Sequence, residues 1–472
     1  MKKILLITLS IGMVYTAEAA YSLDSCRNMA LHNNKLIKMA QENRHGASLL
    51  KESARAAYLP GIDFTGTYFY NQHIINLLGE DAKLPTMSFD PSTMSYQYNL
   101  VKGPDGIPIK DPSSGNYIPS EIAVIPKEAM SYDVHNVFAG AFTLTQPVYM
   151  GGQIKALNEI AGYGEKIAAA MTNKVSQDIV FAVDEAYWTV VSLKEKKLLA
   201  ESFVNLTDSL CHNVDLMLQQ GVATKSDLLS VEVRVNEARI ALVKVSNGLT
   251  LSRMALAQLC GLPAQTEMQL EDESGVFINA ETPAIDIQDV YLRRQDLEVV
   301  RQSINVLKGK EKLSLSEMLP KIAVVGMYSF SNPNLIDGFK KRFGGGFSVG
   351  AALTVPIWHW GGDYKKYKAA RTSTNAQRLL LEDLEEKVQL QVSQAQFSLD
   401  EATKTYKMAT LNMEKAEENL RQAQLAFKEG MLTTSDVLAA QTAWLAANSE
   451  KIDAEIGIRL SHTYLSKVLG IL

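Results

Sequence analysis

The side chains best able to hold a metal ion or attack a substrate are scattered along this sequence. Its 7 histidines and 3 cysteines lack the close spacing of metal ligands or of a redox pair. The motifs of zinc proteases, serine hydrolases, phosphate loops and dinucleotide-binding folds are absent. We therefore expect no catalytic residue, no cofactor and no metal site, and we expect that the protein is not an enzyme.

Composition and charge exclude a second class of function. The chain of 472 residues is 46% hydrophobic and 21% charged, and its net charge is -5. Proteins that bind nucleic acid carry clusters of basic residues, which this sequence lacks. We expect no nucleic-acid partner.

Two short repeated segments combine a glycine with a nearby acid. Each places a glycine six positions before an aspartate, Gly221 before Asp227 and Gly430 before Asp436. The glycine predicts a tight turn, and the residues that follow predict the start of a helix. An aspartate there can accept hydrogen bonds from the free backbone N–H groups of the first turn. Capping is therefore one role that we expect for both acids.

The N-terminus has the pattern of a secretory signal. Two lysines precede an apolar stretch at residues 4–14, and an Ala-Glu-Ala cleavage pattern ends at Ala19. We predict a signal peptide over residues 1–19 and a mature chain from Ala20. Cys26 lies close behind, so lipid attachment to that cysteine remains an alternative, although the acid two positions before it disfavours the required cleavage.

A long apolar stripe marks the second half of the chain. Along it, apolar residues recur at alternating spacings of three and four, which is typical of helices that supercoil against a neighbour. A poorer stripe lies 209 positions earlier, from Ile179 to Leu218. The positions of the main stripe are Leu381, Leu384, Val388, Val392, Ala395, Leu399, Ala402, Tyr406, Ala409, Met413, Ala416, Leu420, Ala423 and Phe427.

Matching landmarks indicate that one unit occurs twice. Three pairs of landmarks are 209 positions apart: Pro147 and Pro356, Gly221 and Gly430, and Gly261 and Gly470. A fourth pair, Pro60 and Pro320, is 260 positions apart. The difference places an insertion in the first unit. We divide the chain into the signal peptide, a first repeat at 20–261, a linker at 262–285 and a second repeat at 286–472.

Within each repeat the patterns predict a helix, two strands, a long helix and a return helix. The strands alternate large apolar residues with small or polar ones, as in strands that cross a bilayer between lipid and a lumen, although a soluble sheet also fits. Four strands cannot close a barrel, which needs about eight, so several chains would pool them. The predicted helices are 24–59, 153–219, 226–260, 286–319, 363–429 and 435–469, the predicted strands are 62–71, 134–145, 322–330 and 347–355, and 73–131 is predicted to be irregular.

Helix lengths suggest how each repeat is assembled. One long helix of about 67 residues matches two of about 35 residues stacked end to end. Each repeat then supplies two equal columns, one continuous and one in two pieces.

This duplicated order, behind a signal peptide, resembles the TolC-type outer membrane channel proteins, the outer membrane factors of efflux pumps and type I secretion systems. The resemblance covers essentially the whole mature chain. It implies a mainly α fold with membrane β-strands, in which a homotrimer pools four strands per chain into a twelve-stranded β-barrel in the outer membrane lipid. A long coiled-coil α-barrel would extend into the periplasm.

The resemblance also implies a function and partners. The protein would be a passive channel that exports substrates delivered by an inner-membrane transporter and a periplasmic adaptor, or membrane fusion protein. Gly221 with Val222 and Gly430 with Met431 match the turns that contact the adaptor. A periplasmic coiled-coil adaptor or scaffold remains the alternative, although adaptors usually carry one hairpin and not a duplicated unit.

The resemblance gives the two acids a role besides capping. Asp436 matches an acid whose three copies ring the periplasmic entrance, and Asp227 matches a position of the latch that closes it. The sequence departs from the family pattern at Ala439, where a second acid is common, and at Leu432, where a basic latch residue is common.

Overall fold

The computed structural model describes residues 20–271, 286–334 and 337–472. The predicted signal peptide and most of the predicted linker lie outside these residues. The chain divides into two compact units, one made of helices and one made mainly of strands. Among the described residues, the helical unit contains 20–54, 155–271, 286–314 and 364–472, and the strand unit contains 55–154, 315–334 and 337–363.

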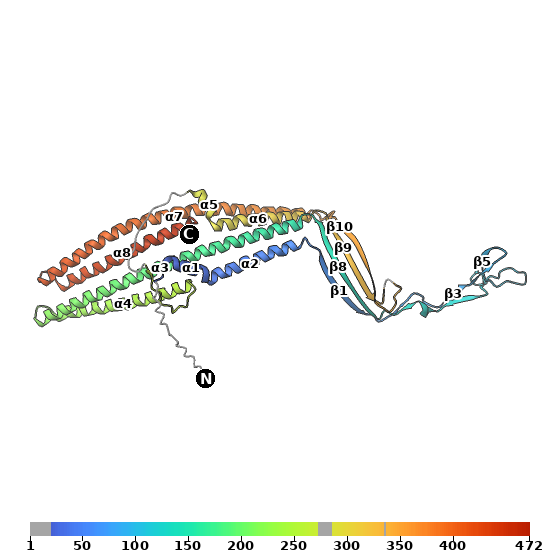
Figure 1. Cartoon of the computed structure of the whole chain (residues 1–472), viewed down its shortest axis with the longest axis horizontal. Helices are drawn as coiled ribbons and strands as arrows, with labels where there is room; N and C mark the ends of the chain where they lie inside the picture. Colours follow the sequence, from blue (N-terminus) through green and yellow to red (C-terminus); the bar gives the residue numbers. More distant parts are fainter. Residues whose placement is uncertain (1–19, 272–285, 335–336) are drawn as a thin grey trace, which may run out of the picture. The chain divides into compact units, whose positions relative to one another are not determined.

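The strand unit is built on one four-stranded antiparallel sheet with the order β1-β8-β9-β10 (Figure 1). These strands are β1 (Gly61–Tyr70), β8 (Asn136–Met150), β9 (Lys321–Asn332) and β10 (Gly344–Thr354). The four predicted strands are confirmed. β8 continues past its predicted end, because a shift in register after Pro147 accommodates a residue without an N–H. Within the described part of the chain, β1 and β10 each pair on one side only.

One face of this sheet is aromatic. Phe64 of β1 pairs with Phe142 of β8, Phe142 with Tyr328 of β9, and Tyr328 with Phe347 of β10, so four rings form one row across all four strands. In the next row Phe330 lies over glycine, since a Cβ atom at Gly140 would come within 2.6 Å of its ring. Glycine is needed at that point to make room for the ring.

Most residues of the opposite face of the sheet are small or polar, although Met327 and Val325 of β9 and Phe69 of β1 also lie on it. Side chains alternate between the two faces along each strand, so residues that pair across the sheet lie on the same face. The alternation predicted from the sequence is therefore confirmed. The residues of this face include Asp63, Thr65, Thr67, Ala139, Ala141, Thr143, Ser329, Ser331 and Ser348.

The insertion between β1 and β8 is folded, so the prediction of an irregular segment at 73–131 is wrong. Three two-stranded antiparallel ladders follow one another along it, together with the short 3-10 turn η1 (Lys127–Met130). Strands of two to four residues are too short to produce a recognisable alternation, which is why the sequence did not reveal them. The pairs are β2 (Ile75–Asn76) with β7 (Ser131–Tyr132), β3 (Ala82–Pro85) with β6 (Ile122–Ile125), and β4 (Met87–Asp90) with β5 (Ser95–Tyr98).

The helical unit contains two pairs of long helices that lie side by side (Figure 1). Helices α3 (Gln153–Gln219) and α7 (Gly362–Lys428) have 67 residues each, and α4 (Lys225–Leu259) and α8 (Thr434–Val468) have 35 each. The predicted boundaries of these four helices are confirmed to within one residue. Every predicted stripe position of α7 is buried or half-buried, and the stripe packs mainly against α8.

The two helices predicted before the strand pairs are each broken, so the prediction of one continuous helix is wrong in both repeats. The breaks fall at Asn34 and Arg294, whose ψ angles of 130° and 115° are extended. The resulting helices are α1 (Leu23–Asn33) and α2 (Lys35–Ala56) in the first repeat, and α5 (Ile287–Arg293) and α6 (Gln295–Ser316) in the second.

Each break lies where a return helix ends. The Asn34 amide nitrogen donates to the carbonyl of Leu259 in α4 at 2.9 Å, and an Arg294 guanidinium nitrogen donates to the carbonyl of Val468 in α8 at 3.2 Å. This placement agrees with the predicted stacking of half-length helices. We call Asn33, Asn34, Leu259 and Gly261 the first joint, and Arg293, Arg294, Val468 and Gly470 the second joint.

Candidate functional site

The two helix tips turn through the same backbone motif. Gly221 has a φ of 79° and Gly430 a φ of 71°, values that favour glycine. The N–H of Val222 bonds the carbonyl of Met217 at 2.9 Å, and the N–H of Met431 bonds that of Ala426 at 2.8 Å. These bonds satisfy the last carbonyls of α3 and α7 in the manner of a Schellman motif.

Both predicted acids cap the helix that follows the tip. The Asp227 carboxylate accepts the backbone N–H of Thr224 at 2.9 Å, while the Thr224 hydroxyl accepts the N–H of Asp227 at 3.1 Å. Asp436 and Thr433 repeat this arrangement with distances of 2.9 and 3.3 Å. Each pair is a capping box, so the capping role expected from the sequence is present in both repeats.

The same hydrogen bonds set the charge of the acids. The Thr224 hydroxyl and backbone N–H lower the pKa of Asp227, and those of Thr433 lower the pKa of Asp436. Both carboxylates are therefore ionised at neutral pH. Asp436 is exposed and Asp227 half-exposed, which leaves both charges open to water or to another chain.

Exposed apolar residues lie at the two tips. The side chain of Val222 is 69% exposed and that of Met431 is 72% exposed. Leu432, at the position of the family's basic latch residue, is also exposed. Each tip thus offers an exposed apolar side chain five positions before an ionised carboxylate.

The structure brings the two tips together. Phe427 of α7 and Val437 of α8 pack in one buried cluster with residues of α3 and α4 such as Val214, Leu228 and Val231. All six predicted site residues therefore lie at one end of the helical unit, which the sequence alone could only infer from the repeat.

One set of side-chain contacts between the two repeats, near the tips, was not predicted. The Arg234 guanidinium of α4 donates to the Thr442 hydroxyl of α8 at 2.6 Å and stacks over the Phe203 ring of α3. It also pairs with Glu237 at 2.8 Å. The contact joins the two repeats across more than 200 positions, so no local pattern could have indicated it.

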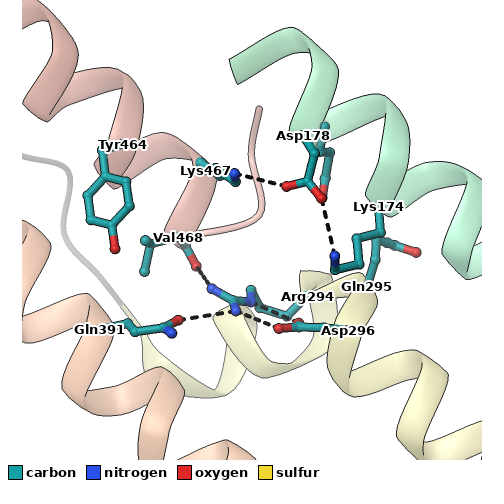
Figure 2. Close-up of a pocket in the computed structure, with 10 residues that line it drawn as sticks. Lys174, Asp178, Arg294, Gln295, Asp296, Gln391, Tyr464, Lys467 and Val468 are labelled. Carbon is teal, nitrogen blue, oxygen red and sulfur yellow. Dashed lines mark hydrogen bonds and ion pairs between the residues drawn. The ribbon is translucent and has the colours of Figure 1, made fainter. Parts of the chain in front are cut away.

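A second polar site lies at the second joint. Figure 2 shows Arg294 bridging the Val468 carbonyl, the Gln391 amide oxygen and the Asp296 carboxylate. Nearby, Lys467 pairs with Asp178 at 2.9 Å, across the hollow that these side chains line. Each cation in this network has an acidic or carbonyl partner, so the network serves to hold α3, α6, α7 and α8 together.

The described residues offer little else that could do chemistry. Within them, no group of three or more histidine, cysteine or acidic side chains could hold a metal ion. Among the same residues, none of the helices is both long enough and apolar enough to span a bilayer.

Comparison with known proteins finds a matching family and several similar folds. A family model described as outer membrane efflux protein matches residues 124–262 and 287–470. The fold is similar to that of CusC (TM-score 0.72, 15% identity, 96% of this chain and 92% of that one). It is equally similar to the CmeC outer membrane channel of Campylobacter jejuni (0.72, 15%, 95% and 85%) and close to MtrE of Neisseria gonorrhoeae (0.71, 16%, 95% and 89%). No curated protein sequence matches the chain significantly.

Proposed function

This chain belongs to the outer membrane efflux protein family, and from that premise we propose that it is a passive, trimeric channel of the outer membrane. Its fold is that of the TolC-like channels. In this role it would export substrates handed over by an inner-membrane transporter and a periplasmic adaptor. It would need no energy source or catalytic residue of its own.

The observation that carries this proposal is the sheet with two different faces and two open edges. An aromatic face suits lipid, and a small, polar face suits a water-filled lumen. Unpaired strand edges are not tolerated in a bilayer, so β1 and β10 need partners. Pairing β10 of one copy with β1 of the next closes a barrel, and three copies supply enough strands.

The helical unit supports the same assembly. Apolar residues on α7 remain exposed on the side away from its buried stripe, four of them spaced by multiples of seven positions. A comparable exposed stripe follows α4. Two stripes of this kind on one chain fit neighbouring subunits of a ring. The exposed residues are Leu390, Phe397, Leu411 and Leu425 on α7, and Leu229, Val233, Ile240, Val243 and Leu251 on α4.

In this assembly the tips form the periplasmic entrance. Three copies of Asp436 would ring it with carboxylates and Asp227 would lie at the latch that closes it, each acid still capping its own helix. Gly221 with Val222 and Gly430 with Met431 would contact the adaptor. Capping and ring roles are compatible, because the carboxylates are exposed while they cap.

Membrane fractionation tests the channel. We expect the protein in the outer membrane, as a trimer that dissociates on heating, and we expect it to conduct ions in planar bilayers. A soluble periplasmic monomer would contradict the proposal and favour the adaptor alternative.

A conductance measurement tests the entrance. Replacing Asp436 by Ala should weaken the block of single-channel current by divalent or trivalent cations, because one ring of carboxylates is lost. Thr433→Ala, which removes the hydroxyl of the same capping box and keeps the Asp436 charge, is the matched control for loss of a cap. Unchanged block in Asp436→Ala would limit Asp436 to capping.

A further inference from the structure

Two of the three cysteines lie together in the core of the helical unit. The side chains of Cys26 in α1 and Cys260 at the end of α4 are both 0% exposed and belong to one apolar cluster. The Cys260 thiol donates to the Cys26 carbonyl at 3.6 Å. Cys211 lies apart from them, half-buried beside the cluster under the tips.

The surrounding contacts hold this pair from both sides. On one side, Asn34 bonds Leu259 as described above. On the other, Tyr21 pairs with the segment after α4, since its N–H bonds the Gln269 carbonyl at 2.8 Å and its carbonyl accepts the Glu271 N–H at 3.1 Å. With α1 fixed at both ends against the end of α4, the Cys260 sulfur stays beside Cys26, which is the placement that a disulfide requires.

We propose that Cys26 and Cys260 form a disulfide bond when the chain folds in the periplasm. The proposal rests on the proposed function, because that function places the mature chain in an oxidising compartment, where disulfides form and persist. The bond would tie the N-terminal helix to α4 across 234 positions, and closing so long a loop restricts the unfolded chain.

The oxidation is an exchange with a thiol–disulfide oxidoreductase. One thiolate of the chain attacks the disulfide of the enzyme, the second thiolate attacks the resulting mixed disulfide, and the enzyme leaves as a dithiol with two electrons and two protons. In the folded chain, hydrogen bonding to Cys260 and burial raise the pKa of Cys26. Because the thiolate is the nucleophile, exchange takes place during folding, before the pair is buried.

The same contacts argue against a lipid on Cys26. Lipidation requires cleavage directly before the modified cysteine, which would remove Tyr21 and also Ser22. The Ser22 hydroxyl caps α1 by accepting the N–H of Ser25 at 3.2 Å. Both residues take part in the fold, so the fold favours a mature chain that begins upstream of them.

Thiol trapping on the native protein tests the bond. Outer membranes are denatured in iodoacetamide without a reductant, and the protein is analysed by intact mass and peptide mapping. We expect only Cys211 to be alkylated, with the Cys26 peptide linked to the Cys260 peptide. Alkylation of all three cysteines, a lipid on Cys26 or a bond to Cys211 would overturn the proposal.

Two variants provide matched controls, and trapping in denaturant makes them readable whatever their folding. Cys211→Ala should show no alkylation before reduction and two alkylated cysteines after it. Cys260→Ala should expose Cys26 to alkylation. If Cys26 of Cys260→Ala instead stays blocked, a partner other than Cys260 holds it and the assignment is wrong.

The same membranes separate this test from that of the proposed function. A chain found in the outer membrane with three free thiols overturns the disulfide alone. A chain found elsewhere overturns the proposed function, and the pair is then scored on purified protein refolded with glutathione disulfide. Linkage of Cys26 to Cys260 in that sample supports the pairing, and its absence overturns it.

Discussion

The first and second joints share a backbone and differ in their side chains. Asn34 and Arg294 are 260 positions apart and each donates to a carbonyl at the end of a return helix. Gly261 and Gly470 follow that carbonyl with φ angles of 76° and 71°. Both joints adjoin a buried apolar cluster, and the second also opens onto a polar hollow (Figure 2).

The charges around the two joints show this difference most clearly. Near the first joint, Arg27 binds Asp184 through two hydrogen bonds of 2.7 and 2.6 Å, and the Asp184 side chain is 0% exposed. At the second, Arg294 binds Asp296, whose side chain is 32% exposed. Duplication has kept the bond that satisfies a helix end, because an unpaired carbonyl is costly, while the chemistry around it has diverged.

Removal of an arginine from each site should give the largest difference. Arg27→Met leaves the Asp184 carboxylate buried without a partner, which should cost about 3 kcal/mol. Arg294→Met leaves Asp296 able to reach water and should cost only about 1–2 kcal/mol. Thermal melting followed by far-UV circular dichroism measures both. Lys404→Met, in an exposed pair with Asp400, is the control and should change nothing measurable. Equal losses of stability for the two arginine variants would show that the two aspartates do not differ in their access to water.

Replacing the glycines of the two joints by alanine should give the second-largest difference in stability. A Cβ atom at Gly261 would lie 2.6 Å from the Asn33 Cβ, whereas one at Gly470 would lie 3.1 Å from the Arg293 Cβ. Both variants to Ala incur about 1–2 kcal/mol for the left-handed backbone, and Gly261→Ala adds a clash. We expect a lower melting temperature for Gly261→Ala than for Gly470→Ala. Gly221→Ala, which meets nothing within 4 Å, isolates the backbone cost. The reverse order would show that the second joint is the tighter one.

The side-chain bond that caps α4 should contribute less. Asn34→Ala removes the donor to the Leu259 carbonyl and also the acceptor of the Leu36 N–H, so we expect a loss of about 1 kcal/mol for each bond in the free energy of unfolding. Asn34→Asp keeps an acceptor for the Leu36 N–H but cannot donate to the Leu259 carbonyl, so it isolates the loss of that donor. A melting temperature like that of the wild type for both variants would mean that water replaces the bond.

The tip caps should give the smallest and most symmetrical effect. Thr433 lowers the pKa of Asp436 in the folded state, so the stabilisation is present above the ordinary pKa of 3.8 and disappears as the pH falls through the lower folded value. The melting temperature of Asp436→Asn should therefore fall below that of the wild type at neutral pH and match it in strong acid. Asp227→Asn should behave alike. A difference that persists in strong acid would exclude the carboxylate charge as its cause.

Much of the fold follows from local patterns. Apolar residues at alternating spacings of three and four predicted the long helices, and alternation of large apolar with small or polar residues predicted the strands. Glycines followed by Thr-x-Ser-Asp predicted the tips and their caps. The sequence did not predict the breaks at Asn34 and Arg294, because both residues are compatible with a helix. Each break arises because the end of another helix lies against that position. Asp184 and Arg27 are 157 positions apart, so only the fold could pair them. The separation of 260 positions between Asn34 and Arg294 was the one available signal for the joints.

Whether three copies close one barrel is tested most directly by native mass spectrometry of the protein extracted from the outer membrane in detergent. A mass of three mature chains is the predicted result, because β1 and β10 then find partners and the exposed stripes of α4 and α7 are covered. A stable monomer would leave strand edges open in the bilayer, and either a monomer or a complex of two chains would contradict the trimeric channel.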